Sequence, residues 1–165
     1  MILYPNLYLG NILDIEEEII NKNQIKGLLI DVDNTIMKYD KSLLEGIEEW
    51  TQKMKDLNVK LCILSNTNNK KKVERVSKLL DIPFIYLANK PFKKGFKKGK
   101  MLLGIEEKNI AVVGDQIFTD ILGANRMKMI SILTVPLEKR DILITKVKRP
   151  IENYIIKMYK KKGSR

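Results

Sequence analysis

Short apolar runs alternate along most of the chain with segments in which apolar residues recur every three or four positions. The apolar runs have the length of strands and lie at 28–30, 59–64, 84–87, 110–113 and 129–135. The helical spacing occurs between them, at 42–57, 70–80, 93–103 and 119–127. Alternation of strand and helix predicts an α/β fold of three layers, α/β/α, with a mostly parallel five-stranded sheet in the middle.

A chain of 165 residues is long enough for one domain with a sizeable hydrophobic core and too short for two domains of typical size. We therefore predict a single domain, 1–165, whose core spans 26–135. From residue 141 to 162 the pattern changes to a basic amphipathic helix with an apolar stripe. The stripe consists of Ile151, Tyr154, Ile155, Met158 and Tyr159. It can pack onto the protein's own domain, which we favour, or lie on a membrane interface.

Composition removes several classes of chemistry. The chain has no histidine, which excludes a histidine base, a serine–histidine pair and any zinc site that uses imidazole. Its one cysteine, Cys62, lies in an apolar run and is predicted to be a buried core residue. The start of the chain has no secretory signal pattern, and no apolar run is long enough to span a bilayer. These features predict a cytoplasmic protein.

The formal net charge of +11 predicts attraction to anionic partners such as phosphates, nucleic acid or acidic lipid. Lysines cluster at 70–72 and again at 93–100, each time at the start of a predicted helix. We predict a positive rim near the edge of the sheet that carries the polar strand ends. The alternative is a solvated helix face in a lysine-rich chain.

Asp31 and Asp33 follow the first apolar run directly. Residues i and i+2 of a strand lie on the same side, so both carboxylates are expected together at the carboxyl end of this strand. Ligands of open α/β sheets bind at this edge. Two neighbouring carboxylates repel each other unless a positive charge lies beside them, and a divalent cation is the simplest candidate. The alternative is that Asp33 and Asn34 form only a turn.

Polar residues also follow the next three apolar runs, and in a parallel sheet all of them converge on one edge. They are Ser65 and Asn66, Lys90, and Asp115 with Asp120. Such residue types suit phosphoryl transfer, in which the phosphate is neutralised, gripped and attacked in line. Carboxylates can hold Mg²⁺ or act as the nucleophile, a serine hydroxyl can donate to phosphate, and a lysine can stabilise the charge of the transition state.

Taken in order, these residues resemble the motifs of the haloacid dehalogenase (HAD) superfamily of phosphatases. The matching motifs are Asp31-Val32-Asp33-Asn34-Thr35, Ser65-Asn66, Lys90-Pro91, and Gly114-Asp115 followed by Asp120. More specifically, the stretch from Val113 to Asn125 is similar to the YqeG-type subclass IIIA phosphatases, which are related to mitochondrial phosphatidylglycerophosphate phosphatases. The resemblance implies a Rossmann-like HAD fold and Mg²⁺ as the cofactor.

The resemblance also implies a role for each residue. Asp31 would be the nucleophile and a metal ligand, and Asp33 the general acid/base, with its backbone carbonyl on Mg²⁺. Ser65 and Lys90 would hold the phosphate, and Asp115 would bind the metal directly. The other two implied residues are Asn66, orienting the substrate or leaving group, and Asp120, acting on the metal through water or another ligand. The alternatives are a helix-start acid for Asp120, a turn hydroxyl for Ser65 and a surface lysine for Lys90.

The intervals between these motifs are filled by ordinary helices and strands, so we predict no cap domain and an open site screened at most by the loop 36–41. The leading hypothesis is a Mg²⁺-dependent phosphomonoester phosphatase that forms a phosphoaspartate. Phosphatidylglycerophosphate at a membrane surface is its best candidate substrate, and a sugar phosphate or nucleotide is the alternative. A nucleic-acid or ribosome-associated module on the same scaffold is permitted by the charge, but the lysines show no interleaved aromatic platform of the kind that single-strand binders need.

Overall fold

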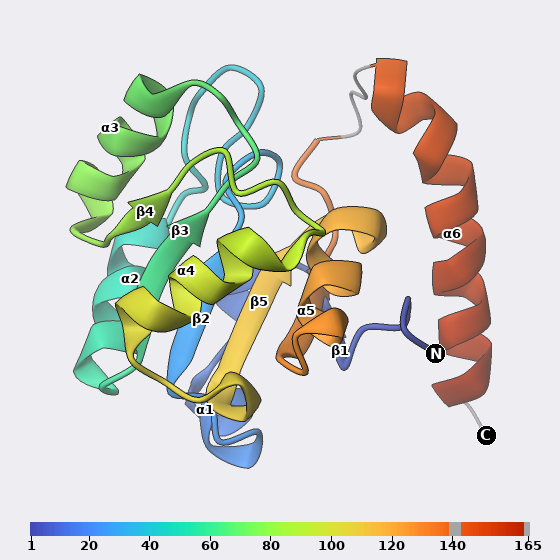
Figure 1. Ribbon diagram of the computed structural model, residues 1–165, viewed down its shortest axis with the longest axis horizontal. Helices are drawn as coiled ribbons and strands as arrows, with labels where there is room; N and C mark the ends of the chain where they lie inside the picture. The colour runs from blue at the N-terminus through green and yellow to red at the C-terminus, as the bar shows by residue number, and fades with distance from the viewer. Residues whose placement is uncertain (139–142, 164–165) are drawn as a thin grey trace.

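The structure, a computed structural model, describes residues 1–138 and 143–163, with the backbone alone for 143–149 and 162–163. Within these residues, six parallel strands form one sheet in the order β1-β6-β5-β2-β3-β4 (Figure 1). The strands are β1 (Leu7–Leu9), β2 (Gly27–Ile30), β3 (Lys60–Leu64), β4 (Phe84–Ile85), β5 (Ile110–Gly114) and β6 (Ile130–Thr134). This arrangement confirms the predicted parallel α/β sheet.

The sheet has one strand more than predicted. β1 pairs with β6 at the edge of the sheet, with Leu7 opposite Ile132 and Leu9 opposite Thr134. Its three residues are only partly buried, so they present neither a long apolar run nor a clear alternation that a sequence pattern could reveal.

Helices cover both faces of the sheet, because successive side chains of a buried strand point to opposite sides. The face that holds Leu28 and Ile30 packs against α1 (Glu17–Lys22), α2 (Ile47–Asp56) and α3 (Lys70–Leu80). The face that holds Leu29 packs against α4 (Lys93–Leu103) and α5 (Leu122–Arg126). The three-layer prediction is therefore confirmed.

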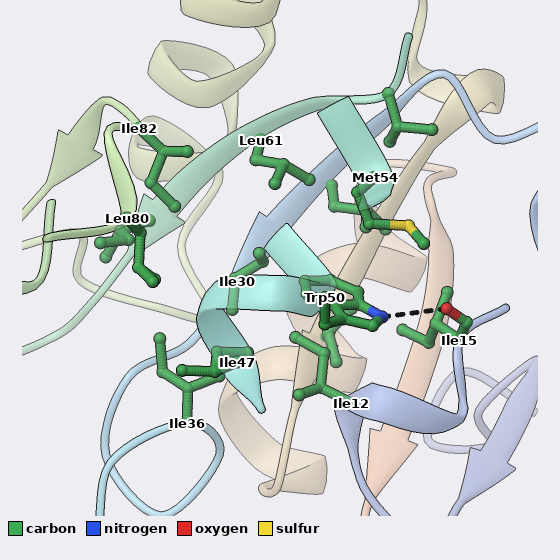
Figure 2. Packing of buried hydrophobic residues seen from close by; sticks show 14 of the residues in the cluster. Ile12, Ile15, Ile30, Ile36, Ile47, Trp50, Met54, Leu61, Leu80 and Ile82 are labelled. Carbon is green, nitrogen blue, oxygen red and sulfur yellow. Dashed lines mark hydrogen bonds between the residues drawn. The ribbon is translucent and has the colours of Figure 1, made fainter. Parts of the chain in front are cut away.

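Trp50 of α2 lies at the centre of the first of these two cores. Figure 2 shows its indole among Ile12, Ile47 and Met54, with Nε1 donating a hydrogen bond to the carbonyl of Ile15 at 3.0 Å. Burying a polar N–H is costly unless it has an acceptor, so this bond lets a large aromatic ring fill the core.

Two helices differ from their predicted limits. α2 begins at Ile47 rather than near residue 42, because Gly46 has a φ of +85° and a bridge between Met37 and Leu43 occupies the preceding segment. The predicted helix 119–127 begins earlier, as a π-helical turn, η3 (Ile117–Ile121), that continues into α5. The structure also has two short 3-10 turns, η1 (Ile12–Asp14) and η2 (Glu107–Asn109).

The C-terminal helix α6 (Leu143–Gly163) lies beside α5 and β1 (Figure 1). Ile155 packs against Ile117 and Leu133, whereas Tyr154 and Met158 are exposed. The predicted apolar stripe is thus divided, with one edge packed onto the rest of the chain and the other facing outward. None of the helices in the described ranges combines the length and the apolarity that crossing a membrane requires.

Candidate active site

The centre of the site is the carboxyl end of β2, which lies between β5 and β3. Ile30, the last residue of β2, pairs with Val113 of β5 and Ile63 of β3. The N–H of Asp31 then donates to the carbonyl of Val113 at 2.9 Å, which holds Asp31 against the end of β5. This register places the residues that follow all three strands at the same edge of the sheet, as the sequence predicted.

Three buried carboxylates meet at this edge. Asp31, Asp115 and Asp120 each offer an oxygen, and these oxygens lie within 4.8 Å of one another. The exposed fractions of the three residues are 8%, 3% and 1%. Charges of one sign so close together and so poorly hydrated require a neighbouring positive charge.

Lys90 supplies positive charge within this cluster. Its ammonium nitrogen lies 2.5 Å from Oδ1 of Asp31 and 2.7 Å from Oδ1 of Asp120. Only 6% of the residue is exposed, so Lys90 is not a surface lysine. A buried ammonium group with two carboxylate partners is a fixed donor at the place where an anion would arrive.

Asn66 holds the backbone of Lys90 from the neighbouring loop. Its Oδ1 accepts from the N–H of Lys90 at 2.7 Å, and its Nδ2 donates to the carbonyl of Lys90 at 3.1 Å. The sequence suggested that Asn66 would orient substrate. In the structure its amide fixes the position of Lys90 across 24 residues of chain.

Burial raises the pKa of Asp31 to about 8, since the surrounding protein disfavours its charged form. Lys90 acts in the opposite direction, and the negative charges of Asp120 and Asp115 raise the pKa further. Burial also acts to lower the pKa of Lys90, but the charges of Asp120 and Asp31 outweigh it and hold this pKa above its ordinary value. A divalent cation bound beside Asp31 would lower this pKa again.

Asp120 is seated by the unusual turn that contains it. Its Oδ2 accepts from the N–H of Gln116 at 3.2 Å, four residues earlier, as an acid near a helix start does. Its Oδ1 instead contacts the ammonium group of Lys90 at 2.7 Å. One oxygen of Asp120 therefore binds its own turn, and the other binds a residue of the cluster. Gly114 makes room for it, because a Cβ there would lie 2.2 Å from Cγ of Asp120.

Ser65 follows β3 and is 1% exposed. Its N–H donates to the carbonyl of Ile85 at 2.9 Å, and its Oγ accepts from the N–H of Thr67 at 3.2 Å. The second bond is typical of a turn hydroxyl, and it leaves the O–H proton able to turn toward an anion at the sheet edge.

Asp33 differs from the other site residues in its surroundings. It is exposed and forms an ion pair with Lys72 of α3. In the sequence Lys72 is one member of a lysine run, and nothing local links it to Asp33, because 39 residues separate the two partners.

Asn34, in the loop that follows β2, forms hydrogen bonds with the segment after β6. It has a φ of +64°, which asparagine tolerates better than most residues. Its Nδ2 donates to the carbonyl of Glu138 at 3.0 Å, and its Oδ1 accepts from the N–H of Glu138 at 2.8 Å. The predicted turn role of Asn34 therefore extends to bracing a segment 104 residues away.

The donor set fits a hard divalent cation. Three carboxylates with no imidazole or thiolate among them are the ligands that Mg²⁺ takes in proteins, together with waters and phosphate oxygens. The chain has no histidine, and its single cysteine is buried in the core on the α4 side of the sheet.

Comparison with known proteins places this chain in a family. The family described as mitochondrial PGP (phosphatidylglycerophosphate) phosphatase matches residues 1–137. A protein of Bacillus subtilis strain 168 named probable phosphatase YqeG is 36% identical over 160 residues, which are 96% of this chain and 92% of that protein.

Solved structures with low sequence identity share the fold. A putative HAD family hydrolase from Streptomyces avermitilis has a TM-score of 0.52 and 18% identity, over 68% of this chain and 77% of that one. A 3-deoxy-D-manno-octulosonate 8-phosphate phosphatase from Yersinia pestis has a TM-score of 0.51 and 13% identity, over 73% of this chain and 78% of that one. These similarities agree with the HAD-type fold predicted from the motifs.

Proposed function

The chain belongs to the mitochondrial PGP phosphatase family of HAD-type phosphatases, and from this premise we propose that it hydrolyses phosphomonoesters with Mg²⁺ through a phosphoaspartate at Asp31. The observation that carries the proposal is the position of Asp31. Its carboxylate is buried at the end of the central strand, in contact with Lys90 and in reach of the same ion as Asp115 and Asp120. A nucleophile, a fixed cation and a metal site are thereby combined.

In the first step of the proposed reaction, an oxygen of Asp31 forms a bond to phosphorus as the bond to the ester oxygen breaks. Asp33 leaves Lys72, takes a proton from solvent and gives that proton to the departing oxygen. Ser65 and Lys90 hold the oxygens of the phosphoryl group during this transfer, where its charge is spread.

In the second step, Asp33 takes a proton from a water molecule whose oxygen attacks the phosphorus. The bond between phosphorus and Asp31 breaks, and inorganic phosphate and the free carboxylate result. Mg²⁺, held by Asp31, Asp115 and the backbone carbonyl of Asp33, would neutralise charge on the phosphate when bound. Asp120 would keep Lys90 in place, as its 2.7 Å contact indicates.

The access to the site supports a large or surface-bound substrate. In the described part of the chain no cap domain is inserted between the motifs, so nothing of that kind encloses the site. α4 presents four exposed lysines just after Lys90, namely Lys93, Lys94, Lys97 and Lys98. Phe92 is 65% exposed beside them. An apolar side chain among lysines suits an anionic lipid interface, where each lysine contributes about 1 kcal/mol.

We therefore propose phosphatidylglycerophosphate as the substrate, presented at the surface of a membrane, and a peripheral position for the protein there. Sugar phosphates and nucleotides are the competing substrates. A phosphate-release screen in Mg²⁺ distinguishes them, with phosphatidylglycerophosphate offered in vesicles. The largest kcat/KM is expected for the lipid, and a larger value for a sugar phosphate or nucleotide would contradict the choice of substrate.

The mechanism is tested with Asp31→Asn, which keeps the size of the side chain and removes the nucleophile. We expect phosphate release to fall by a factor of at least about 10³, whereas the exposed Asp56→Asn on α2 keeps wild-type activity. Circular dichroism of both variants controls for folding. Asp31→Asn with wild-type turnover would exclude a phosphoaspartate at this residue.

A further inference from the structure

A buried acid of the C-terminal helix touches the segment that carries the metal-site residues. Glu152 of α6 is 3% exposed, although its helix lies at the periphery of the molecule (Figure 1). Burial of a carboxylate is costly, so its partners show what the contact achieves.

Glu152 binds two backbone groups of the turn η3. Oε1 accepts from the N–H of Ile117 at 2.9 Å and from the N–H of Phe118 at 3.4 Å. The first N–H groups of a helical segment have no acceptor within it, and a carboxylate there forms charge-assisted bonds and complements the helix dipole.

This turn begins two residues after Asp115 and contains Asp120. Its position therefore decides where both carboxylates lie relative to Asp31 and Lys90. We propose that Glu152 is a positioning residue for the metal site, so that α6 completes a site whose reacting groups all lie between Asp31 and Asp120. The effect on catalysis rests on the proposed phosphatase function, whereas the effect on the turn and on metal affinity does not.

Other residues of α6 also hold the helix in place. Tyr159 packs edge-on against Tyr4 with ring centroids 5.8 Å apart, and the ammonium group of Lys160 lies 4.8 Å from the centre of the Tyr8 ring. Ile155 is buried against Ile117 and Leu133. Removal of the Glu152 carboxylate is therefore expected to release the turn while the helix stays attached.

The test compares Glu152→Ala and Glu152→Gln with Tyr159→Leu in the full chain. Calorimetric titration measures the affinity for Mg²⁺, and hydrogen exchange in the absence of metal reports on the amides of Asp120 and Ile121. We expect Glu152→Ala to weaken Mg²⁺ binding about 10- to 100-fold, as loss of an outer partner of a metal ligand does, and to speed exchange at both amides.

Glu152→Gln keeps an oxygen acceptor in the same place and is expected to restore most of the affinity. Tyr159→Leu disturbs α6 without touching the turn and should leave both readouts unchanged. Unchanged affinity and exchange in Glu152→Ala, or equal losses in Tyr159→Leu, would overturn the proposal. If Glu152→Ala does not fold, Glu152→Asp, which keeps the charge but shortens the reach, takes its place with the same expectation.

The experiment distinguishes a failure of the proposed phosphatase function from a failure of the positioning role. If no phosphate ester is hydrolysed by the wild-type protein, the faster exchange at Asp120 and Ile121 in the variant still supports the positioning role. If the esters are hydrolysed and Glu152→Ala has wild-type exchange and kinetics, the positioning role alone is wrong.

Discussion

At the scale of single residues, the environment of each ionisable side chain decides its chemistry. Asp31 and Asp33 are two residues apart, yet one is buried among charged groups and the other is exposed beside Lys72. This difference suits the two proposed roles, nucleophile for Asp31 and proton carrier for Asp33, because only the exposed carboxyl can exchange partners with solvent and a leaving group. Cys62 illustrates the opposite case, an ionisable group that burial makes inert.

Burial raises the pKa of the Cys62 thiol to about 12, so at pH 8 the folded protein holds it as the unreactive thiol. We expect almost no reaction with a disulfide reagent such as 5,5′-dithiobis(2-nitrobenzoate) at pH 8, and one equivalent of reaction in guanidinium chloride. Absorbance at the released thiolate band measures both. Rapid labelling of the native protein would show that this part of the core opens readily.

Lys90→Met is expected to destabilise the fold as well as remove activity. The variant leaves Asp31 and Asp120 buried without their shared cation, and breaking such a pair costs about 3–5 kcal/mol. Urea unfolding at pH 8 gives the change in the free energy of unfolding. The exposed Lys94→Met serves as control and is expected to stay within about 0.5 kcal/mol of wild type. Equal stability of the two variants would contradict the buried ion pair.

At the scale of elements, the strands were more predictable than the turns that place the side chains. β2, β3 and β5 were found from apolar runs because they are buried on both faces, which leaves no alternation to misread. β1 has no such apolar run, and η3 starts early without a local signal, because the carboxylate that accepts from the N–H of its first residue belongs to Glu152, 35 residues further along the chain.

The packing of α4 gives a prediction at this scale. A Cβ at Gly95 would lie 2.4 Å from the carbonyl oxygen of Ala88, which is backbone and cannot swing away. Gly95→Ala is expected to lose about 1–3 kcal/mol of stability by overpacking, although alanine favours helix by about 1 kcal/mol. Lys97→Ala, on the exposed side of α4, is the control. Thermal unfolding of both checks the sign, and a stabilised Gly95→Ala would contradict this close approach.

At the scale of the whole molecule, the ordered motifs predicted which residues would gather, whereas the partners that hold them were not predictable. Two contacts, Asn66 with Lys90 and Asp33 with Lys72, join segments that are far apart in the chain, so they are set by the tertiary fold rather than by any local pattern. The charge of +11 is visible in the sequence, but the placement of four lysines on the exposed side of α4 follows from which face that helix buries.

The lysines of α4 give a prediction for the molecule as a whole. Replacement of Lys93, Lys94, Lys97 and Lys98 by Gln should weaken binding to vesicles that contain anionic lipid, because each lysine contributes about 1 kcal/mol there. Hydrolysis of a small ester such as p-nitrophenyl phosphate is expected to stay at the wild-type rate. Vesicle sedimentation measures the first effect. Unchanged vesicle binding would show that the charge has no docking role.

The proposed mechanism depends above all on a covalent bond between phosphorus and Asp31. Acid quenching of the protein during turnover of a radiolabelled phosphate ester, followed by peptide mapping, measures this bond directly. We predict label on the peptide that contains Asp31, released by mild base as an acyl phosphate is, and none in Asp31→Asn. Rapid turnover with no label on Asp31, or label on another residue, would contradict the proposed mechanism.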